Sequence, residues 1–165
     1  MNSQVVKVGD SIVLKGMMRA IGTKVGTGEV MQDTGWCPNM VMLGTYLGKG
    51  LILARLAGDL TYTCVLNWLT IGSSSTAPTA SDTQLGAEVT RGSCVNQIIS
   101  TNVLTIQAFI PDAQLANGSY PEAGSVVDGS ASVNTGKQFN HILFTIPYVK
   151  ASGQDTTLQL QLTIN

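Results

Sequence analysis

The chain has 165 residues, enough for one domain with a sizeable hydrophobic core. Only 12% of its residues are charged and the formal net charge is −1, whereas about 25% of the residues in an average soluble domain are charged. No excess of basic residues is present to attract nucleic acid. With this low proportion of charged residues, an isolated monomer would be poorly soluble. We therefore expect copies of the chain or other subunits to cover part of its surface.

The sequence also argues against a membrane protein. The longest apolar stretch, residues 40–56, is interrupted by Lys49 and Arg55 and is shorter than the roughly 20 apolar residues that a membrane span needs. Residues 1–16 alternate between polar and apolar types and lack the continuous hydrophobic core of a signal peptide. We therefore expect the chain to be made and kept in a cytoplasm.

The cysteines indicate free thiols. Cys37, Cys64 and Cys94 are odd in number and widely spaced, which favours reduced thiols over a disulfide framework. A zinc site made of these three cysteines and His141 is disfavoured, because the paired cysteine knuckles typical of such sites are missing. We expect no metal ion and no cofactor.

The N-terminal region predicts strands followed by a loop or arm. Residues 4–15 alternate around Gly9-Asp10 and predict two short strands. Residues 17–39 are rich in Gly and Thr and end in Trp36-Cys37-Pro38, which is typical of a loop. We interpret residues 1–39 as N-terminal strands and an extended arm that contacts a neighbouring subunit, and residues 40–165 as the main domain.

Residues 40–58 predict a helix. Leu43, Leu47 and Leu51 recur every four residues, as on one face of a helix. Asn39 is a suitable N-cap and Gly58 a suitable stop. The glycines inside this stretch count against the prediction, because each costs about 1 kcal/mol relative to alanine in a helix interior.

The rest of the chain predicts antiparallel strands. Residues 60–71 alternate with period two, and their far end is apolar on both faces. Residues 93–100 and 103–110 predict a hairpin that turns at Thr101-Asn102. Residues 141–150 predict a strand, and residues 156–165 predict a half-buried strand. In the last strand we expect the inward side chains to be Leu158, Leu160, Leu162 and Ile164.

Catalytic chemistry is not indicated. His141 is the only histidine and lies among apolar residues at the start of a predicted strand, so we interpret it as a packing or edge residue. No nucleophile elbow of the GxSxG type is present. Glu88 and Glu122 could form a glycosidase pair, but we favour a structural role in which one or both pair with Arg91. We therefore predict that the protein is not an enzyme.

The stretch "TIGSSSTAPTASDTQLGAEVTR", residues 70–91, is the most informative segment. It could be a phosphate-binding loop, but Gly72 has no second glycine until Gly86 and no nearby lysine, whereas a P-loop needs GxxxxGK followed by Ser or Thr. Pro78 and Asp82 instead predict a short, capped helical turn. We expect Leu85 to anchor the segment in the core, with Glu88 and Arg91 paired or reaching a neighbouring chain.

The order of these features resembles a family of small structural proteins of tailed bacteriophages, which are tail, fibre-base, neck or decoration components. The resemblance covers roughly residues 40–165. One departure is Asn140-His141, which stands where the family commonly has an arginine. The residues that carry the resemblance form three ordered blocks. The first block is Ile71, Gly72, Thr76, Pro78, Asp82, Leu85, Glu88 and Arg91, the second is Glu122 and Gly124, and the third is Phe144, Pro147, Lys150, Leu158 and Ile164.

The resemblance implies a mainly β fold, an antiparallel β-sandwich with one α-helix packed across it, and the composition of residues 1–39, outside the resemblance, adds an extended N-terminal segment. It also implies a cyclic homo-oligomer, a trimer or a hexamer, that contacts other virion proteins and resides in the virion after synthesis in the host bacterial cytoplasm. It implies no catalytic residue. The interface or scaffold candidates are Trp36, Asp82, Leu85, Glu88, Arg91, Glu122 and Lys150.

An alternative function belongs to a different class. The chain could be a receptor- or carbohydrate-binding head-fibre module, or an adhesin, in which exposed aromatic rings stack on a sugar. Of the tryptophans and tyrosines, we expect only Trp36 and Tyr120 to lie in loops, so the platform for such stacking is small.

Overall fold

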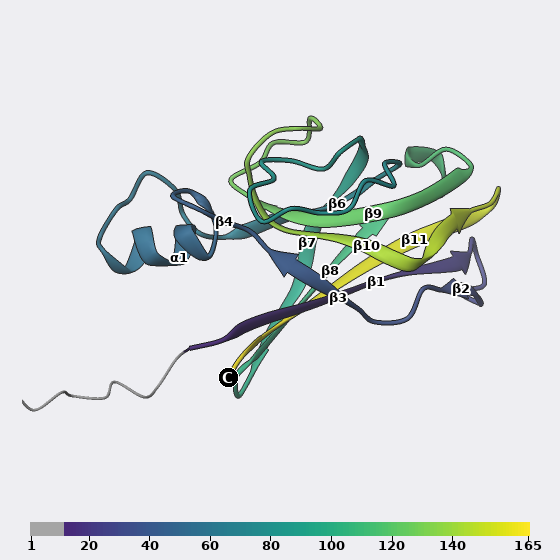
Figure 1. Cartoon of the computed structure of the whole chain (residues 1–165). Helices are drawn as coiled ribbons and strands as arrows, with labels where there is room; N and C mark the ends of the chain where they lie inside the picture. The colour runs from purple at the N-terminus through teal and green to yellow at the C-terminus, as the bar shows by residue number, and fades with distance from the viewer. Residues whose placement is uncertain (1–11) are drawn as a thin grey trace, which may run out of the picture.

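Alternating apolar and polar residues produce long antiparallel strands in the computed structural model, which describes residues 12–165 (Figure 1). The elements are β1 (Leu14–Lys24), β2 (Val30–Asp33), β3 (Cys37–Val41), β4 (Leu43–Gly44), β5 (Leu47–Gly48), α1 (Lys49–Leu56), β6 (Leu66–Gly72), β7 (Glu88–Ser100), β8 (Val103–Ile110), the 3-10 turn η1 (Asp112–Gln114), β9 (Gly118–Val127), β10 (Lys137–Lys150) and β11 (Gln154–Ile164).

The strands close into a barrel. Their order is β11-β8-β7-β6-β9-β10-β3-β1, and β1 pairs back onto β11 from Leu14↔Ile164 to Lys24↔Gln154. The short strand β2 pairs with the far part of β1, on the same edge as β3. The prediction of a mainly β protein is therefore confirmed, but the expected sandwich is corrected to a closed antiparallel barrel.

Two strands explain why a barrel forms instead of two separate sheets. β7 pairs with β6 up to Ser93 and with β8 from Cys94 onward. β3 pairs with β1 at Cys37–Asn39 and with β10 at Met40–Val41. A strand that changes partner in this way turns a corner between two halves, so the two sides of the barrel share strands.

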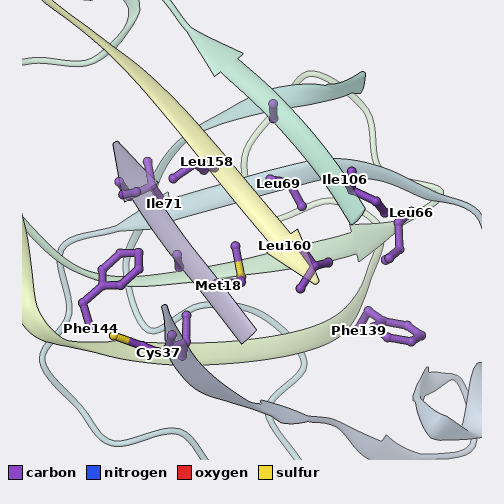
Figure 2. Packing of buried hydrophobic residues seen from close by; sticks show 14 of the residues in the cluster. Met18, Cys37, Leu66, Leu69, Ile71, Ile106, Phe139, Phe144, Leu158 and Leu160 are labelled. Carbon is purple, nitrogen blue, oxygen red and sulfur yellow. The ribbon is translucent and has the colours of Figure 1, made fainter. Parts of the chain in front are cut away.

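The interior of the barrel is filled with apolar side chains. Met18 of β1, Ile106 of β8 and Leu160 of β11 have no exposed surface. Figure 2 shows side chains from β1, β3, β6, β8, β10 and β11 gathered in this core. In β11 the predicted alternation is confirmed for Leu158, Leu160 and Leu162, which are buried. Ile164 is half exposed, because it lies at the last position of the strand, where the barrel opens.

The N-terminal residues that the structure describes belong to the barrel, so the loop expected over residues 17–39 is corrected to three strands, β1, β2 and β3, with short connections. β1 lies between β11 on one edge and β3 on the other, so the boundary expected at residue 39 does not coincide with a break in the sheet. Of the two strands predicted within residues 4–15, residues 4–11 lie outside the described part of the chain. The contact of this segment with a neighbouring subunit stays a prediction.

The helix is much shorter than the sequence predicts. Residues 40–48 form the end of β3 and the β4–β5 hairpin, and α1 begins only at Lys49. Gly48 precedes the helix with φ at +45°, and a Cβ there would lie 2.2 Å from the carbonyl oxygen of Met42. This close approach of backbones requires glycine and favours a hairpin over a continuous helix. Gly58 has φ at +82° just after the helix, as expected for a stop.

The helix also does not pack across the sheet. α1 packs against the β4–β5 hairpin, and Figure 1 shows it set off to one side of the barrel strands. Leu51 is its only fully buried residue.

Two other predictions concern strands: β6 begins at Leu66 instead of residue 60, and its far end is buried on both faces as expected. The predicted hairpin at Thr101-Asn102 is confirmed.

Candidate functional site

The 73–87 loop folds over the outer face of β9 and β10 and buries a cluster of charges. His141 of β10 lies between two carboxylates: its Nδ1 is 2.8 Å from Asp82 Oδ2, and its Nε2 is 2.9 Å from Glu122 Oε2. Asp82 belongs to the loop and Glu122 to β9. The cluster therefore ties the loop to two adjacent strands, and His141, expected as a packing or edge residue, is a buried residue with both ring nitrogens bonded to carboxylates.

The loop holds an anion, and that anion is a side chain of the same chain. Glu122 is fully buried and accepts hydrogen bonds from the backbone N–H groups of Ser74 (3.1 Å), Gly86 (2.9 Å) and Ala87 (2.7 Å). A Cβ at Gly72 would lie only 2.4 Å from Glu122 Oε1, so this glycine allows the carboxylate to approach. The resemblance to a phosphate-binding loop thus has a physical basis, but Glu122 occupies the place of the ligand.

The charges of the cluster reinforce each other. Burial lowers the pKa of His141, but the hydrogen bonds and negative charges of Glu122 and Asp82 outweigh this effect, and the net pKa is raised. Burial raises the pKa of Glu122, but the hydrogen bonds from His141 and from the three backbone N–H groups lower it overall. The pKa of Asp82 is also lowered, because the hydrogen bonds from Thr79 and His141 exceed the effect of burial.

Asp82 shapes the turn that precedes Leu85. It accepts hydrogen bonds from the backbone N–H of Thr79 at 2.9 Å and from the Thr79 hydroxyl group. These residues form a turn, and the expected short helical segment is absent from the loop. The prediction that Leu85 is an anchor is confirmed: its side chain is buried, and its Cδ2 lies 3.1 Å from where a Cβ of Gly124 would be.

A second buried ion pair joins Glu88 and Arg91. The Nε of Arg91 donates to Glu88 Oε1 and its Nη2 donates to Oε2, each at 2.7 Å, and both side chains are almost fully buried. The Nη1 of Arg91 also donates to the carbonyl oxygens of Ser130 and Thr135. The pair lies on β7 and not on a helix. Its predicted formation is confirmed, and it fixes the loop between β9 and β10.

The other two predicted residues have different surroundings. Lys150 is buried at the end of β10 and donates hydrogen bonds to Asp112 and to the Ala151 carbonyl oxygen. The hydrogen bond from Lys150 lowers the pKa of Asp112. Trp36 is half buried, and the guanidinium of Arg19 lies 4.7 Å from its ring centre. Of the seven predicted residues, the structure brings Asp82, Leu85 and Glu122 together under the loop.

The functional alternatives considered from the sequence find little support in this geometry. Both ring nitrogens of His141 are bonded to carboxylates, so neither is free to accept a proton from a nucleophile. A hollow of about 500 Å³ lies beside His141. Tyr120 was expected in a loop but is buried in β9, and its hydroxyl group donates to the Ala116 carbonyl oxygen. It therefore offers no ring for stacking on a sugar.

Burial disfavours the reactive thiolate form of two of the three cysteines, Cys64 and Cys94. Cys37, Cys64 and Cys94 are all free. Burial raises the pKa of Cys94 to about 12 and also raises the pKa of Cys64. Within residues 12–165, no group of three or more His, Cys, Asp or Glu side chains is arranged as a set of metal ligands. In the same part of the chain, no helix has the length and apolar character that crossing a membrane requires.

An apolar cavity of about 430 Å³ lies at one end of the barrel. It lies where β1, β6 and β8 begin and where β7 and β11 end, and Ile52 of α1 forms part of its wall. Its lining is mainly hydrocarbon, including Leu66, Leu104, Ile106 and Phe139. No local sequence signal points to this cavity, because its walls come from segments far apart in the chain.

Three exposed apolar side chains belong to the wall of this cavity, just before β6 and at the ends of β7 and β11. We call this set the apolar end: Val65, Ile99 and Ile164. An apolar cavity rimmed by exposed apolar side chains is typical of an interaction surface or a ligand-binding groove.

Comparisons with known proteins give no relative for this chain: no family model, no curated protein and no solved structure matches it.

Proposed function

We propose that this chain is a structural subunit of a tailed bacteriophage virion, a component of the tail, neck, fibre base or capsid surface that acts through contacts between subunits. The observation that carries the proposal is the apolar end, where three large apolar side chains are exposed at the wall of an apolar cavity. A chain with only 12% charged residues has little charge elsewhere to keep such a surface in solution.

The residues that carry the family resemblance support a structural role. Asp82, Glu122 and His141 hold the loop to the barrel, and Glu88 and Arg91 hold a second loop. Their hydrogen bonds are made within the chain, so their chemistry serves to stabilise the frame. His141 supplies the positive charge at the place where the family commonly has an arginine, so the departure seen in the sequence is compensated.

The proposal includes location and partners. The protein is made in the host bacterial cytoplasm, where its three free cysteines stay reduced, and it then joins the virion as a homo-oligomer in contact with other virion proteins. No enzymatic activity and no cofactor belong to the proposed role.

The test is the mass and shape of the purified protein. Light scattering coupled to size-exclusion chromatography should give an integral multiple of 17.3 kDa, and negative-stain electron microscopy should show rings or other closed particles of one size. Addition of the protein to phage particles assembled without it should restore infectivity. A chain that stays a monomer at every concentration and joins no particle would contradict the proposal.

A further inference from the structure

We propose that residues 5–8 add a strand to the barrel, which pairs with the edge of β1 at residues 12–15 and closes the cavity at the apolar end. This segment lies outside the described part of the chain and joins β1 through residues 9–11. An unpaired strand edge, an uncovered apolar side chain and an open cavity all lie where it enters the barrel.

Within the described residues, the first part of β1 has a partner strand on one edge only. Val13 exchanges two backbone hydrogen bonds with Asn165. Because hydrogen-bonding residues alternate along an antiparallel strand, the N–H and C=O groups of Leu14 point to the opposite edge. On that edge β3 is in register with β1 as far as Gly16 and then pairs with β10, and Figure 1 shows it diverging from the start of β1. The edge at residues 12–15 is therefore free among the described strands.

Ile12 shows that the inner face of this edge also lacks a neighbour. Side chains alternate along a strand, so Ile12 lies on the same face as Leu14, which lines the cavity. Further along that face Met18 has no exposed surface, but Ile12 is 83% exposed. An apolar side chain on the inner face of a barrel is stabilised by neighbours on the adjacent strands. For Ile12, the described residues leave that place empty on the free edge.

The alternation along β1 determines the length of the connecting loop. Because Val13 bonds to β11, the free edge offers hydrogen-bonding groups at residues of even number. A two-residue turn at Gly9-Asp10 closes with a hydrogen bond at residue 11, which would put residues of odd number on the free edge. A three-residue loop, residues 9–11, closes at Ile12 and matches the free edge. Hairpin loops of three residues that contain glycine are common.

The apolar residues of the segment match this register. A loop of residues 9–11 places Val8 opposite Ile12 and Val6 opposite Leu14. Residues that face each other across two antiparallel strands share one side of the sheet. Val8 therefore covers Ile12, and Val6 enters the cavity beside Leu14.

The length and the charge of the segment agree with the same register. Gly16 already pairs with β3, so the free edge holds four residues, 12–15. Residues 5–8 supply four residues to pair with them. The outward positions of the new strand are Val5 and Lys7, so the charge of the lysine stays in water and none enters the cavity.

A strand satisfies this end of the barrel better than a small lipophilic molecule does. The cavity of about 430 Å³ is lined mainly by hydrocarbon. Its two amide side chains already have partners. Gln97 Nε2 donates to the Leu66 carbonyl oxygen at 3.2 Å, and Asn102 Nδ2 donates to the Ile164 carbonyl oxygen at 2.7 Å. A small molecule could fill the cavity, but only a strand also pairs with the backbone of Leu14.

The added strand goes beyond the proposed function and leaves surface for it. β6 lies on the other side of the ring of strands from β1. Val65, just before β6, and Ile99, at the end of β7, therefore stay available for contacts between subunits. Whether the subunits assemble and whether residues 5–8 close the cavity are separate questions with separate measurements.

The first experiment compares two adjacent valines. Val6→Asp puts a carboxylate on the inner face and should detach the strand, whereas Val5→Asp puts the same group on the outer face and should leave it paired. Neither substitution touches a described strand, so both barrels should fold. Hydrogen exchange at the backbone amide of Leu14 should be about tenfold faster or more in Val6→Asp than in Val5→Asp and the wild type. The apolar dye anilinonaphthalene sulfonate should gain fluorescence with Val6→Asp alone.

The second experiment tests the register with a disulfide. Lys7→Cys/Val13→Cys joins outward positions of a non-hydrogen-bonded pair, where Cα atoms lie about 4.5 Å apart, within the range for a disulfide. Its disulfide should resist glutathione about tenfold better or more than that of Val6→Cys/Val13→Cys, whose side chains point to opposite faces. In urea the two disulfides should be equally stable, because the loops that they close are almost equal in length. Both pairs are made with Cys64→Ser and Cys94→Ser to remove the native thiols that are partly exposed.

Three results would overturn the proposal. Equal exchange at Leu14 and equal dye fluorescence in Val5→Asp and Val6→Asp would show that residue 6 does not enter the cavity. A wild type that binds the dye as strongly as Val6→Asp would identify the cavity as an open ligand groove. A disulfide of Lys7→Cys/Val13→Cys that forms between two chains instead of within one would place the segment on a neighbouring copy. Light scattering of the wild type measures assembly independently, so none of these results decides the proposed function.

Discussion

Replacing Glu122 with alanine should destabilise the protein strongly, because this carboxylate is the centre of the 73–87 loop. Glu122 is fully buried, pairs with His141, and accepts three backbone hydrogen bonds from the loop. Removing one partner of a buried ion pair costs about 3–5 kcal/mol. The three N–H groups that lose their acceptor add to this cost unless water reaches them. We expect a loss of about 4 kcal/mol in the free energy of unfolding.

The measurement is urea denaturation, supported by hydrogen exchange at the backbone amides of Ser74, Gly86 and Ala87. Glu122→Gln keeps the shape and one acceptor oxygen, so it should cost less, about 1–3 kcal/mol, and it provides the measurement if the alanine variant does not fold. The control is Glu29→Gln, at an exposed carboxylate, which should change stability by no more than about 0.5 kcal/mol. A loss below about 1 kcal/mol for Glu122→Ala, with unchanged amide protection, would refute the idea that the loop is built around this anion.

Two further predictions concern the buried charges. The pKa of His141 is raised in the folded state, so the stability that His141 contributes should be complete below about pH 6.5 and be lost as the pH rises through the folded pKa. The pKa of Glu122 is lowered in the folded state, so the stability that Glu122 contributes should be complete above about pH 4.5 and be lost on acidification. Unfolding free energies measured from pH 4 to 9 should therefore fall on the alkaline side for the wild type and stay flatter for His141→Gln. Arg91→Met leaves the carboxylate of Glu88 buried without its cation and should lower the free energy of unfolding by about 3–5 kcal/mol. A double-mutant cycle with Glu88→Gln, measured by urea denaturation, should show a coupling energy of at least about 1 kcal/mol. Additive effects would show that the two side chains do not form the bidentate pair.

The features that could be predicted from sequence are those with a local signal. The alternation in residues 156–162 predicts which leucines are buried, and the turn residues at Thr101-Asn102 predict the β7–β8 hairpin. The pair of Glu88 and Arg91 could be predicted because the two residues are close in the chain, although they meet on a strand instead of a helix. In each case the information lies within a few residues.

The features that could not be predicted depend on distant contacts. Closure of the barrel needs β1 to pair with β11, where Arg19 and Gln159 are 140 residues apart. His141 finds Asp82 at a separation of 59 residues, and no spacing rule connects them. The helix prediction for residues 40–58 fails because Gly48 adopts a conformation set by the backbone of Met42, and such tertiary contacts override the leucine periodicity.

The location of β1 in the barrel can be tested with two adjacent methionines. Met18 has no exposed surface and faces Leu160 and Cys37 in register, whereas Met17 is 37% exposed on the other face of the strand. Met18→Ala should lower the free energy of unfolding by about 2–5 kcal/mol, and Met17→Ala should change it by no more than about 1 kcal/mol.

This comparison discriminates between a barrel strand and an arm, because the two substitutions are chemically identical. An arm that only reaches a neighbouring subunit would make both variants fold with the stability of the wild type and would place any effect in assembly. A barrel strand gives alternate residues opposite environments, so only Met18→Ala should shift the urea midpoint of the monomer. Deletion of residues 1–39 cannot replace this experiment, since it removes the strand whose eleven registered pairs with β11 close the barrel.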